Sequence, residues 1–262
     1  MNAQTLQIER HDDGLVVVTL NRPESRNAIN TQMGVELREL FVPLTFIAES
    51  ERCIIITGAG DKAFCAGGDL KERNGMSDAA WRAQHAVFEE AFYAVMNCAV
   101  PVIGAVNGAA FGGGCELALA CDFVLAADTA RFALTETTLG IIPGCGGTQN
   151  LPRAVGARRA KELIMTGRPF SAQEALAWGM VNAVHSGEGL MAAALETARA
   201  ICRSAPVAVR QAKKAIQHGL DVDRRTGLAF EIEAYNRTVV TEDRLEGVRA
   251  FAEKRKPRFS GK

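Results

Sequence analysis

The sequence predicts an α/β fold with a helical C-terminal extension. Over roughly the first 130 residues, short continuous apolar runs, typical of buried strands, alternate with glycine-rich turns and helical segments. After Pro143 the pattern changes to mostly helical signals. No linker rich in proline, glycine or serine separates the two parts. We therefore expect a core over residues 1–195, followed directly by a helical region over residues 196–262.

Continuous apolar runs predict the strands of the core, which are expected over residues 15–20, 53–57, 100–106 and 123–127. Helices are expected from Asn30 or Thr31 to about Ala48, from a cap at residues 77–78 to about Asn97, and over residues 112–120. Residues 1–13 contain no apolar core segment, so no strand is expected there. They resemble neither a secretory signal nor a transit peptide.

The C-terminal part is expected to be helical, with one strand at residues 180–184. Ser171 predicts the cap of one helix, and the others are expected over residues 190–203, 206–218, 221–237 and 242–254. A helical extension of this kind must bury its apolar faces, and a neighbouring subunit is a good candidate.

The composition argues against several classes of function. The chain has 262 residues, and its 30 basic residues balance its 30 acidic residues, so it has no general attraction to nucleic acid or membranes. No apolar run reaches the length of a membrane span. Seven cysteines without a Cys-x-x-Cys motif argue against a disulfide framework, and four isolated histidines argue against a metal site. Such cysteines are typical of a reducing compartment, so we expect a cytoplasmic protein.

Two glutamates, Glu116 and Glu136, lie in apolar, glycine-containing stretches where a solvated charge is not expected. Burying a carboxylate is unfavourable unless a partner or a chemical role compensates. Two carboxyl groups in different surroundings can act as acid and base. The run of Gly112, Gly113 and Gly114 before Glu116 can offer free N–H groups to a developing negative charge, because it opens a predicted helix. The pattern favours acid–base chemistry at a carbonyl compound.

Each of these features also has a structural explanation. A glycine run is expected where a helix packs closely on a strand, and Glu116 suits the positive end of a helix. Glu136 would fit equally as a surface acid that opens a helical turn. In the loop of residues 62–72, Asp69 is expected to cap the next helix, while the Gly68 N–H can alternatively face a ligand carbonyl.

Three other motifs are interpreted as structural. Residues 58–63 match G-x-G-x-x-A, but more glycines follow where a dinucleotide site requires a helix. Residues 144–148 lack the Lys-Ser/Thr pair of a P-loop and are expected to form a turn. Cys115 has no histidine near it in the sequence, so a packed thiol is expected rather than a nucleophile.

Taken together, these stretches resemble the crotonase, or enoyl-CoA hydratase/isomerase, superfamily. The resemblance is carried by three motifs in this order, AFCAGGD at residues 63–69, GGGCELA at 112–118 and IPGCGGTQ at 142–149, and it extends over nearly the whole chain. It implies a crotonase-like spiral of ββα units that contains the acyl-CoA site. It also implies a C-terminal helical trimerisation region, and a homotrimer or a homohexamer built from two trimers.

The resemblance further implies that the Gly68 and Gly113 N–H groups form an oxyanion hole for the thioester oxygen. Glu116 would help to activate water, and Glu136 would exchange a proton at the α-carbon. Family members with other reactions often lack one glutamate, so the presence of both favours an enoyl-CoA hydratase, a lyase of fatty-acid and other lipid metabolism. The chain departs from the common pattern at Gly68, where many hydratases have alanine, and at Thr135, where many have proline.

Coenzyme A would be part of the substrate, and no metal or separate cofactor is required. The resemblance implies coenzyme A contacts in two loops and near the C-terminus, at Ser25, Arg26, Ala28, Ala66, Gly68, Asp69, Leu70, Lys71 and Lys254. Arg26 would contact a phosphate, because a guanidinium matches phosphate geometry. Lys254 would reach the ligand of a neighbouring subunit.

Two alternatives remain. One is an enoyl-CoA isomerase or another enolate-forming member of the superfamily. The other is an RNA-binding protein, because residues 69–77 and the C-terminal tail are similar to methylglutaconyl-CoA hydratases, which also bind AU-rich RNA. The balanced net charge opposes RNA binding, while a local patch around Lys71 and Arg73 would favour it. The acyl group is left open, with its pocket expected from residues 76–92 and the C-terminal helices.

Overall fold

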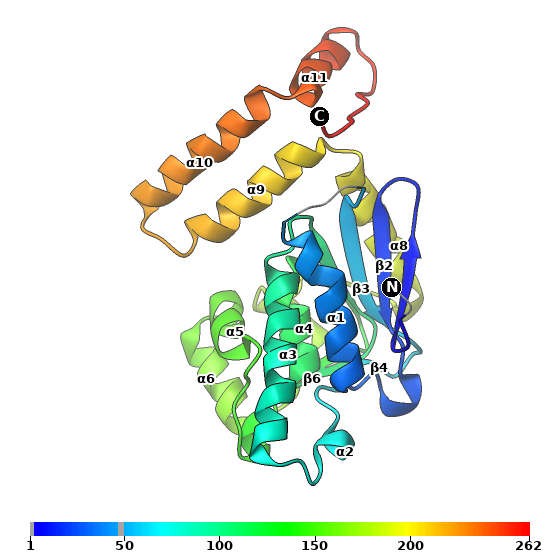
Figure 1. Cartoon of the computed structure of the whole chain (residues 1–262), viewed down its shortest axis with the longest axis vertical. Coiled ribbons are helices and arrows are strands. Elements are labelled where there is room, and N and C mark those ends of the chain that lie inside the picture. Colours follow the sequence, from blue (N-terminus) through cyan, green and yellow to red (C-terminus); the bar gives the residue numbers. More distant parts are fainter. Residues whose placement is uncertain (1–2, 47–49) are drawn as a thin grey trace.

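The core contains two β-sheets, which Figure 1 shows with their surrounding helices. The computed structural model describes residues 3–46 and 50–262. The larger sheet contains, in spatial order, β1 (Leu6–Arg10), β2 (Leu15–Leu20), β3 (Cys53–Gly58), β5 (Val102–Val106), β7 (Phe123–Ala127) and β10 (Ala183–His185). The smaller sheet contains β4 (Ala63–Cys65), β6 (Ala109–Phe111), β8 (Arg131–Ala133) and β9 (Phe170–Ser171).

Successive strands alternate between the two sheets. β3, β5 and β7 lie in the larger sheet, and the strand that follows each of them, β4, β6 or β8, lies in the smaller one. A helical segment then leads to the next pair; these segments include α3 (Asp78–Met96), α4 (Gly113–Ala120) and the 3-10 helix η2 (Glu136–Leu139). All pairings are parallel except β1 with β2 and β8 with β9. The predicted α/β class and the ββα spiral are confirmed.

The central strands are apolar throughout because both faces of the larger sheet are covered. Every residue of β3 and β5 is buried, and the two strands pair in parallel with Ile54 opposite Val102. Continuous apolar runs are the pattern expected for parallel strands that are buried on both sides. On one face, α1 (Thr31–Leu44) and α3 lie side by side (Figure 1). All seven cysteines are buried and unpaired, so they act as small packing residues.

Polar side chains set where the helices begin. Asn30 accepts a hydrogen bond from the Met33 N–H at 3.0 Å, so Asn30 rather than Thr31 caps α1. Ser77 caps α3, and Ser171 caps α7 (Ala172–Ala177) in a capping box with Glu174. Helix α1 ends at Leu44, before the predicted end at Ala48, which lies outside the described residues.

Several elements differ from the sequence prediction. Strand β1 lies within residues 1–13, where no strand was expected; most of its side chains are at least partly exposed, and β2 holds it at the sheet edge. β4, β6 and β8 have three residues each and are too short to produce a periodic signal. The strand expected at residues 180–184 begins at Ala183. Two helices, α5 (Gly147–Val155) and α6 (Ala157–Thr166), fill the region after Pro143.

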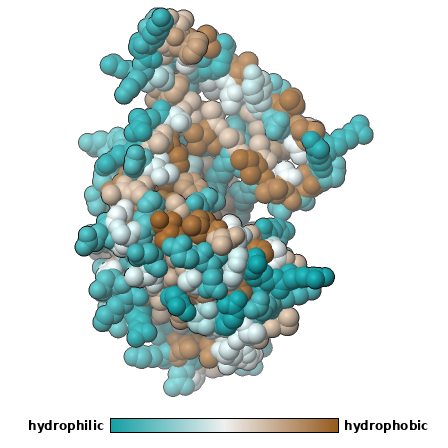
Figure 2. Space-filling model, turned by 180° about the vertical axis from the view of Figure 1, so that it is seen from behind, coloured by the Kyte–Doolittle hydropathy of each residue, from teal (hydrophilic) through white to brown (hydrophobic). Residues whose placement is uncertain are grey.

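The C-terminal region forms a helical hairpin that projects from the core (Figure 1). It contains α9 (Pro206–Gly219) and α10 (Arg224–Val239), followed by α11 (Glu242–Ala252). Lys213 of α9 holds the hairpin to the core through an ion pair with Asp122 at 2.7 Å. Figure 2 shows hydrophobic surface on the projecting hairpin, whose exposed apolar side chains include Ile216, Leu220, Leu228, Ile232 and Tyr235.

The division between residues 195 and 196 stays a prediction. Helix α8 (Gly187–Cys202) runs across this position, and its buried side chains belong to the core. Among the described residues, every helix is too short or too polar to span a lipid bilayer.

Candidate active site

A cleft with a volume of about 620 Å³ lies between α3, the start of α4 and the segment around η2. Its walls contain both predicted acids, Glu116 and Glu136, and both predicted amide donors, Gly68 and Gly113. These four residues come from three segments that are distant in the sequence. The spiral brings them together because β4, β6 and β8 are neighbours in the smaller sheet, and each of the three segments follows one of these strands.

The three glycines at the start of α4 have different roles. Gly112 has a φ of +51°, a conformation that favours glycine. Gly114 packs so closely on β4 that a β-carbon there would lie 2.0 Å from the carbonyl oxygen of Cys65. Gly113 is under neither constraint, because its φ is not positive and a β-carbon would meet only ordinary contacts. Close helix–strand packing, one of the structural explanations, is therefore correct for Gly114.

The backbone N–H groups of Gly68 and Gly113 lie beside each other at the cleft. A methyl group placed on Gly113 would lie 3.7 Å from the Gly68 nitrogen. Gly113 is the first residue of α4, where an N–H has no acceptor inside the helix. Within the described part of the chain, neither N–H donates a hydrogen bond to another residue. Two adjacent free donors at a cleft can bind one oxygen atom.

Glu116 is held by a turn that lies far from it in the sequence. Its Oε1 accepts hydrogen bonds from the N–H groups of Cys145 and Gly147, both at 2.8 Å. Burial raises the pKa of Glu116, and these N–H groups oppose the rise by stabilising the charged form. A side chain at Gly147 would collide with the carboxylate, since its β-carbon would lie 2.9 Å from Oε1. The predicted turn covers only residues 144–146, because Gly147 and Thr148 already belong to α5; this segment positions Glu116.

Glu136 has very different surroundings. It is the first residue of η2, and its Oε2 is buried without a hydrogen-bond partner among the described residues. Burial, with a further contribution from the charge of Glu116, raises the pKa of Glu136 to about 7. The backbone carbonyl of Thr135 accepts hydrogen bonds from the N–H and the hydroxyl of Thr138 at 3.0 and 2.7 Å, and a proline at this position would offer the same acceptor. Glu136 lines the cleft with threonine at position 135.

The two acids thus differ in their hydrogen bonding, although burial raises the pKa of both. Glu116 receives backbone hydrogen bonds that favour its ionised form, while the unpartnered oxygen of Glu136 favours its protonated form. A pair of carboxyl groups whose surroundings differ in this way can accept a proton at one point of a substrate and donate a proton at another.

The residues predicted to contact coenzyme A fall into three groups. Ala66 and Leu70 line the cleft together with Gly68. The segment with Ser25, Arg26 and Ala28 runs beside them, because the Ala66 N–H donates to the Arg26 carbonyl at 3.0 Å. Lys71 is exposed and follows Leu70 at the edge of the cleft. Lys254 lies just after the end of α11 and does not line the cleft of its own chain.

Arg22 was not predicted as a site residue. It connects the two loops that contain most of the predicted coenzyme A contacts. Its Nη1 donates to the Ala28 carbonyl at 2.6 Å and to the Asp69 carboxylate at 2.9 Å. Asp69 also accepts from the Lys71 and Glu72 N–H groups, so it caps α2 (Leu70–Arg73) as expected. The Asp69 carboxylate is therefore committed to the protein. In the sequence, Arg22 lies in the stretch of residues 21–23 with which the family resemblance begins, but that stretch does not indicate a role for its side chain.

Other candidates have no comparable chemistry. Residues 58–63 lead into β4 rather than a helix, which excludes the dinucleotide interpretation. Burial raises the pKa of the Cys115 thiol far above its ordinary value, as expected for a packed thiol.

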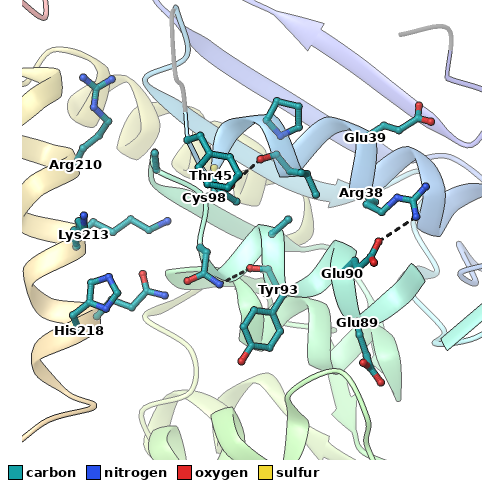
Figure 3. A pocket seen from close by; sticks show the side chains of 18 of the residues that line it. Arg38, Glu39, Thr45, Glu89, Glu90, Tyr93, Cys98, Arg210, Lys213 and His218 are labelled. Carbon is teal, nitrogen blue, oxygen red and sulfur yellow. Dashed lines mark hydrogen bonds and ion pairs between the residues drawn. The ribbon is translucent and has the colours of Figure 1, made fainter. Parts of the chain in front are cut away.

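A larger cavity of about 1320 Å³ lies between α9 and the α1–α3 pair. There, Lys213 and His218 of α9 face Tyr93 and the Arg38–Glu90 ion pair across the opening (Figure 3), and neither predicted acid lines it.

Comparison with known proteins matches residues 10–262 to the family described as enoyl-CoA hydratase/isomerase. The chain is 43% identical over 244 residues to a short-chain-enoyl-CoA hydratase of Clostridium acetobutylicum, covering 92% of each chain. It is 42% identical over 258 residues to human mitochondrial methylglutaconyl-CoA hydratase, covering 97% of this chain and 76% of that one. A crystal structure of an enoyl-CoA hydratase from Bacillus anthracis superposes with a TM-score of 0.96 at 46% identity, covering 99% of this chain and 100% of that one.

The close packing at Gly114 predicts different effects for two neighbouring substitutions. Gly114→Ala should lower the free energy of unfolding by about 3 kcal/mol, because the new methyl group must displace the Cys65 carbonyl. Gly113→Ala, the matched control, should change it by less than about 1 kcal/mol. Urea unfolding of both variants measures the difference, and equal stabilities would show that α4 can move away from β4.

The raised pKa of Glu136 predicts that Glu136→Gln stabilises the protein at alkaline pH. With a folded-state pKa of about 7 against an ordinary value of 4.5, the wild-type contribution to stability is complete below pH 4.5 and is lost as the pH rises through 7. Glutamine remains neutral, so at pH 8 the variant should be more stable by on the order of 2 kcal/mol, with little difference at pH 4.5. Denaturant unfolding at both pH values tests this, and a gap that does not grow with pH would contradict it.

Proposed function

The chain belongs to the enoyl-CoA hydratase/isomerase family, and we propose that it adds water across the 2,3-double bond of a 2-enoyl-CoA thioester. The activity would be that of a hydro-lyase, with coenzyme A as part of the substrate. One observation carries the proposal: two buried acids with different hydrogen bonding share a cleft with two adjacent N–H groups that have no acceptor among the described residues. An α,β-unsaturated thioester needs both features, one for proton transfer and one for its oxygen.

In this proposal the thioester oxygen binds between the Gly68 and Gly113 N–H groups. Adding a nucleophile at the β-carbon moves electron density onto this oxygen. Two fixed donors stabilise the resulting enolate-like charge more than they stabilise the neutral carbonyl, so they lower the barrier. The positive end of α4 adds to this effect because Gly113 opens the helix.

The two glutamates then divide the proton transfers. Ionised Glu116 takes a proton from a water molecule as the water oxygen bonds to the β-carbon. Protonated Glu136 gives its proton to the α-carbon. The pair gives up one proton and gains one, so the sum of the reaction is the addition of one water. The hydrogen bonds that Cys145 and Gly147 donate to Glu116, and the unpartnered oxygen of Glu136, support this assignment.

Coenzyme A would lie along the rim formed by Ser25, Arg26 and Ala28 on one side and by Ala66, Leu70 and Lys71 on the other. The hydrogen bond between Ala66 and Arg26 supports this path, since it joins the two segments. Arg26 and Lys71 are exposed there and can meet phosphate groups. Lys254 would serve the cleft of a neighbouring subunit.

We also propose that residues 196–262 build a homotrimer or a homohexamer. The exposed apolar side chains of the projecting hairpin support this, because such a surface is normally covered by another chain. The cytoplasmic location and the role in lipid metabolism stay predictions. RNA binding is not favoured, because Arg73, one of the two cations of the expected patch, lines the cleft.

The hydratase proposal predicts loss of the conjugated enoyl-thioester absorbance when the protein meets a short 2-enoyl-CoA. Glu116→Gln and Glu136→Gln should each lower kcat by about 100-fold or more, since each removes one proton-transfer group. Near-normal turnover by either variant would refute the assigned roles. A 3-enoyl-CoA that is consumed faster than its 2-enoyl isomer would identify an isomerase instead.

The proton count of the acid pair predicts the pH dependence of kcat/KM. The active state carries one proton on the pair, so kcat/KM should fall as the pH rises through about 7, where Glu136 loses its proton. In Glu136→Gln, the residual activity should lack this alkaline decline, because glutamine does not titrate. Initial rates at subsaturating substrate, measured from about pH 5.5 to pH 9, provide the test, and a wild-type profile that is flat above pH 7 would contradict it.

A further inference from the structure

The backbone around Gly68 pairs with the segment that leads into α1. The Ile29 N–H donates to the Gly67 carbonyl at 2.8 Å, and the Asp69 N–H donates to the Ile29 carbonyl at 2.9 Å. In a parallel pairing of this kind the N–H of the central residue points away from its neighbour, so the Gly68 N–H points away from Ile29. Its direction therefore depends on how firmly these two segments are held together.

The two segments are tied on both sides of this pairing. On one side, the Arg22 side chain donates to the Ala28 carbonyl and to the Asp69 carboxylate. On the other side, Glu72 of α2 accepts a hydrogen bond from the Thr31 N–H at 2.9 Å. Loosening either tie would let the pairing shift, and the Gly68 N–H would shift with it.

Gln84 completes the second tie. It belongs to the buried face of α3, and only 5% of it is exposed. Its amide nitrogen donates to Thr31 Oγ1 and to Glu72 Oε2, both at 2.8 Å. Its amide oxygen accepts from Arg73 Nε, also at 2.8 Å. One side chain thus joins the start of α1, the short helix α2 and the long helix α3.

The partners of the Gln84 amide fix its orientation. Arg73 Nε can only donate and an ionised carboxylate can only accept, so the amide oxygen and nitrogen cannot exchange places. Both N–H bonds and the oxygen have partners, as a buried amide requires. The Arg73 guanidinium also lies over the Trp81 ring, 4.3 Å from its centre, which fastens α2 to α3 a second time.

Gln84 lies behind the cleft wall. Among the described residues, Arg73 lines the cleft, whereas Gln84, which holds it, does not. A methyl group placed on Gly68 would lie 3.5 Å from the Arg73 guanidinium carbon. A shift of Arg73 or of α2 would therefore be passed directly to the Gly68 amide.

We propose that Gln84 is a positioning residue for the oxyanion site, because its three hydrogen bonds hold the Gly68 N–H where the thioester oxygen requires it. The inference rests on the proposed function for the role of Gly68. An N–H donor stabilises the developing charge only if its position is fixed beforehand, and a displacement of about 1 Å can cost on the order of 100-fold in rate. Such precision depends on residues that support the reacting groups from behind.

Substitution of Gln84 should slow turnover without weakening substrate binding. Gln84→Met keeps the length of the side chain and removes all three hydrogen bonds, so it should lower kcat for crotonyl-CoA by about 10- to 100-fold and change KM by less than about 3-fold. Gln84→Glu should lose a similar amount, because a carboxylate cannot donate to Glu72. The double variant Glu72→Gln/Gln84→Glu exchanges donor and acceptor, and it should recover kcat to within about 3-fold of the wild type.

Glu36→Met is the matched control for a loss of buried hydrogen bonds. Glu36 is buried in α1, where its carboxylate accepts from the Gln4 and Thr5 N–H groups at 2.7 and 2.9 Å, and it does not line the cleft. This variant should also lower the urea midpoint of unfolding but keep kcat within about 2-fold of the wild type. Equal losses of kcat in Glu36→Met and Gln84→Met would show that Gln84 supports stability alone, and would overturn the proposal.

The carbonyl band of bound acetyl-CoA tests the same inference without turnover. With ¹³C at the carbonyl carbon, isotope-edited infrared spectroscopy separates this band from those of the protein, and two fixed donors move it to lower wavenumber. Wild-type protein and the double variant should show this shift, whereas Gln84→Met should give a band closer to that of free acetyl-CoA.

The infrared outcomes separate this inference from the proposed reaction. A wild-type shift that Gln84→Met leaves unchanged would overturn the role of Gln84 alone. A wild-type band without a shift would defeat the assignment of the Gly68 and Gly113 amides to the thioester oxygen, and this inference with it. If crotonyl-CoA is not hydrated but the band responds as expected, the hydratase proposal fails and the role of Gln84 stands.

Discussion

The contact between the first turn of α4 and strand β4 is the constraint on which the site depends. Gly114 lies so close to the Cys65 carbonyl that only hydrogen fits between them. This contact brings the start of α4 against the loop after β4, and the Gly113 and Gly68 N–H groups become neighbours as a result. Glu116 then projects from the same turn into the cleft. A single packing contact thus sets the positions of the amide pair and of one acid.

The second level of organisation is electrostatic. Two carboxyl groups lie in one cleft, and the N–H groups of Cys145 and Gly147 donate hydrogen bonds to one of them, Glu116. Among the described residues, one oxygen of Glu136 is buried without a hydrogen-bond partner, and the raised pKa of this group reduces stability at neutral pH. A buried group that reduces local stability in this way is expected at a functional site.

The sequence could predict the elements that have a long or strongly capped signal. The apolar runs of β2, β3 and β7, and the caps at Ser77 and Ser171, follow from local chemistry alone. The strands of the smaller sheet have three residues or fewer and leave no periodic pattern, yet they determine which loops meet. For this reason Glu116 and Glu136 could be singled out as unusual, while their common cleft came only from a family resemblance. The contacts of Arg22 and the inward direction of Arg73 depend on partners that no local pattern identifies.

The distribution of thiols has a further consequence. All seven cysteines are buried at widely separated points, among them Cys53 in β3, Cys115 in α4 and Cys202 at the end of α8. Burial also suppresses their thiolate forms; it raises the pKa of Cys65 to about 12 and that of Cys98 to about 11. Cys145 lines the cleft and Cys98 lines the larger cavity, but an alkylating reagent can reach the other five thiols only when a region of the native chain opens. The native cysteines can therefore serve as position-specific probes. The order in which they are alkylated would show the order in which regions of the fold open.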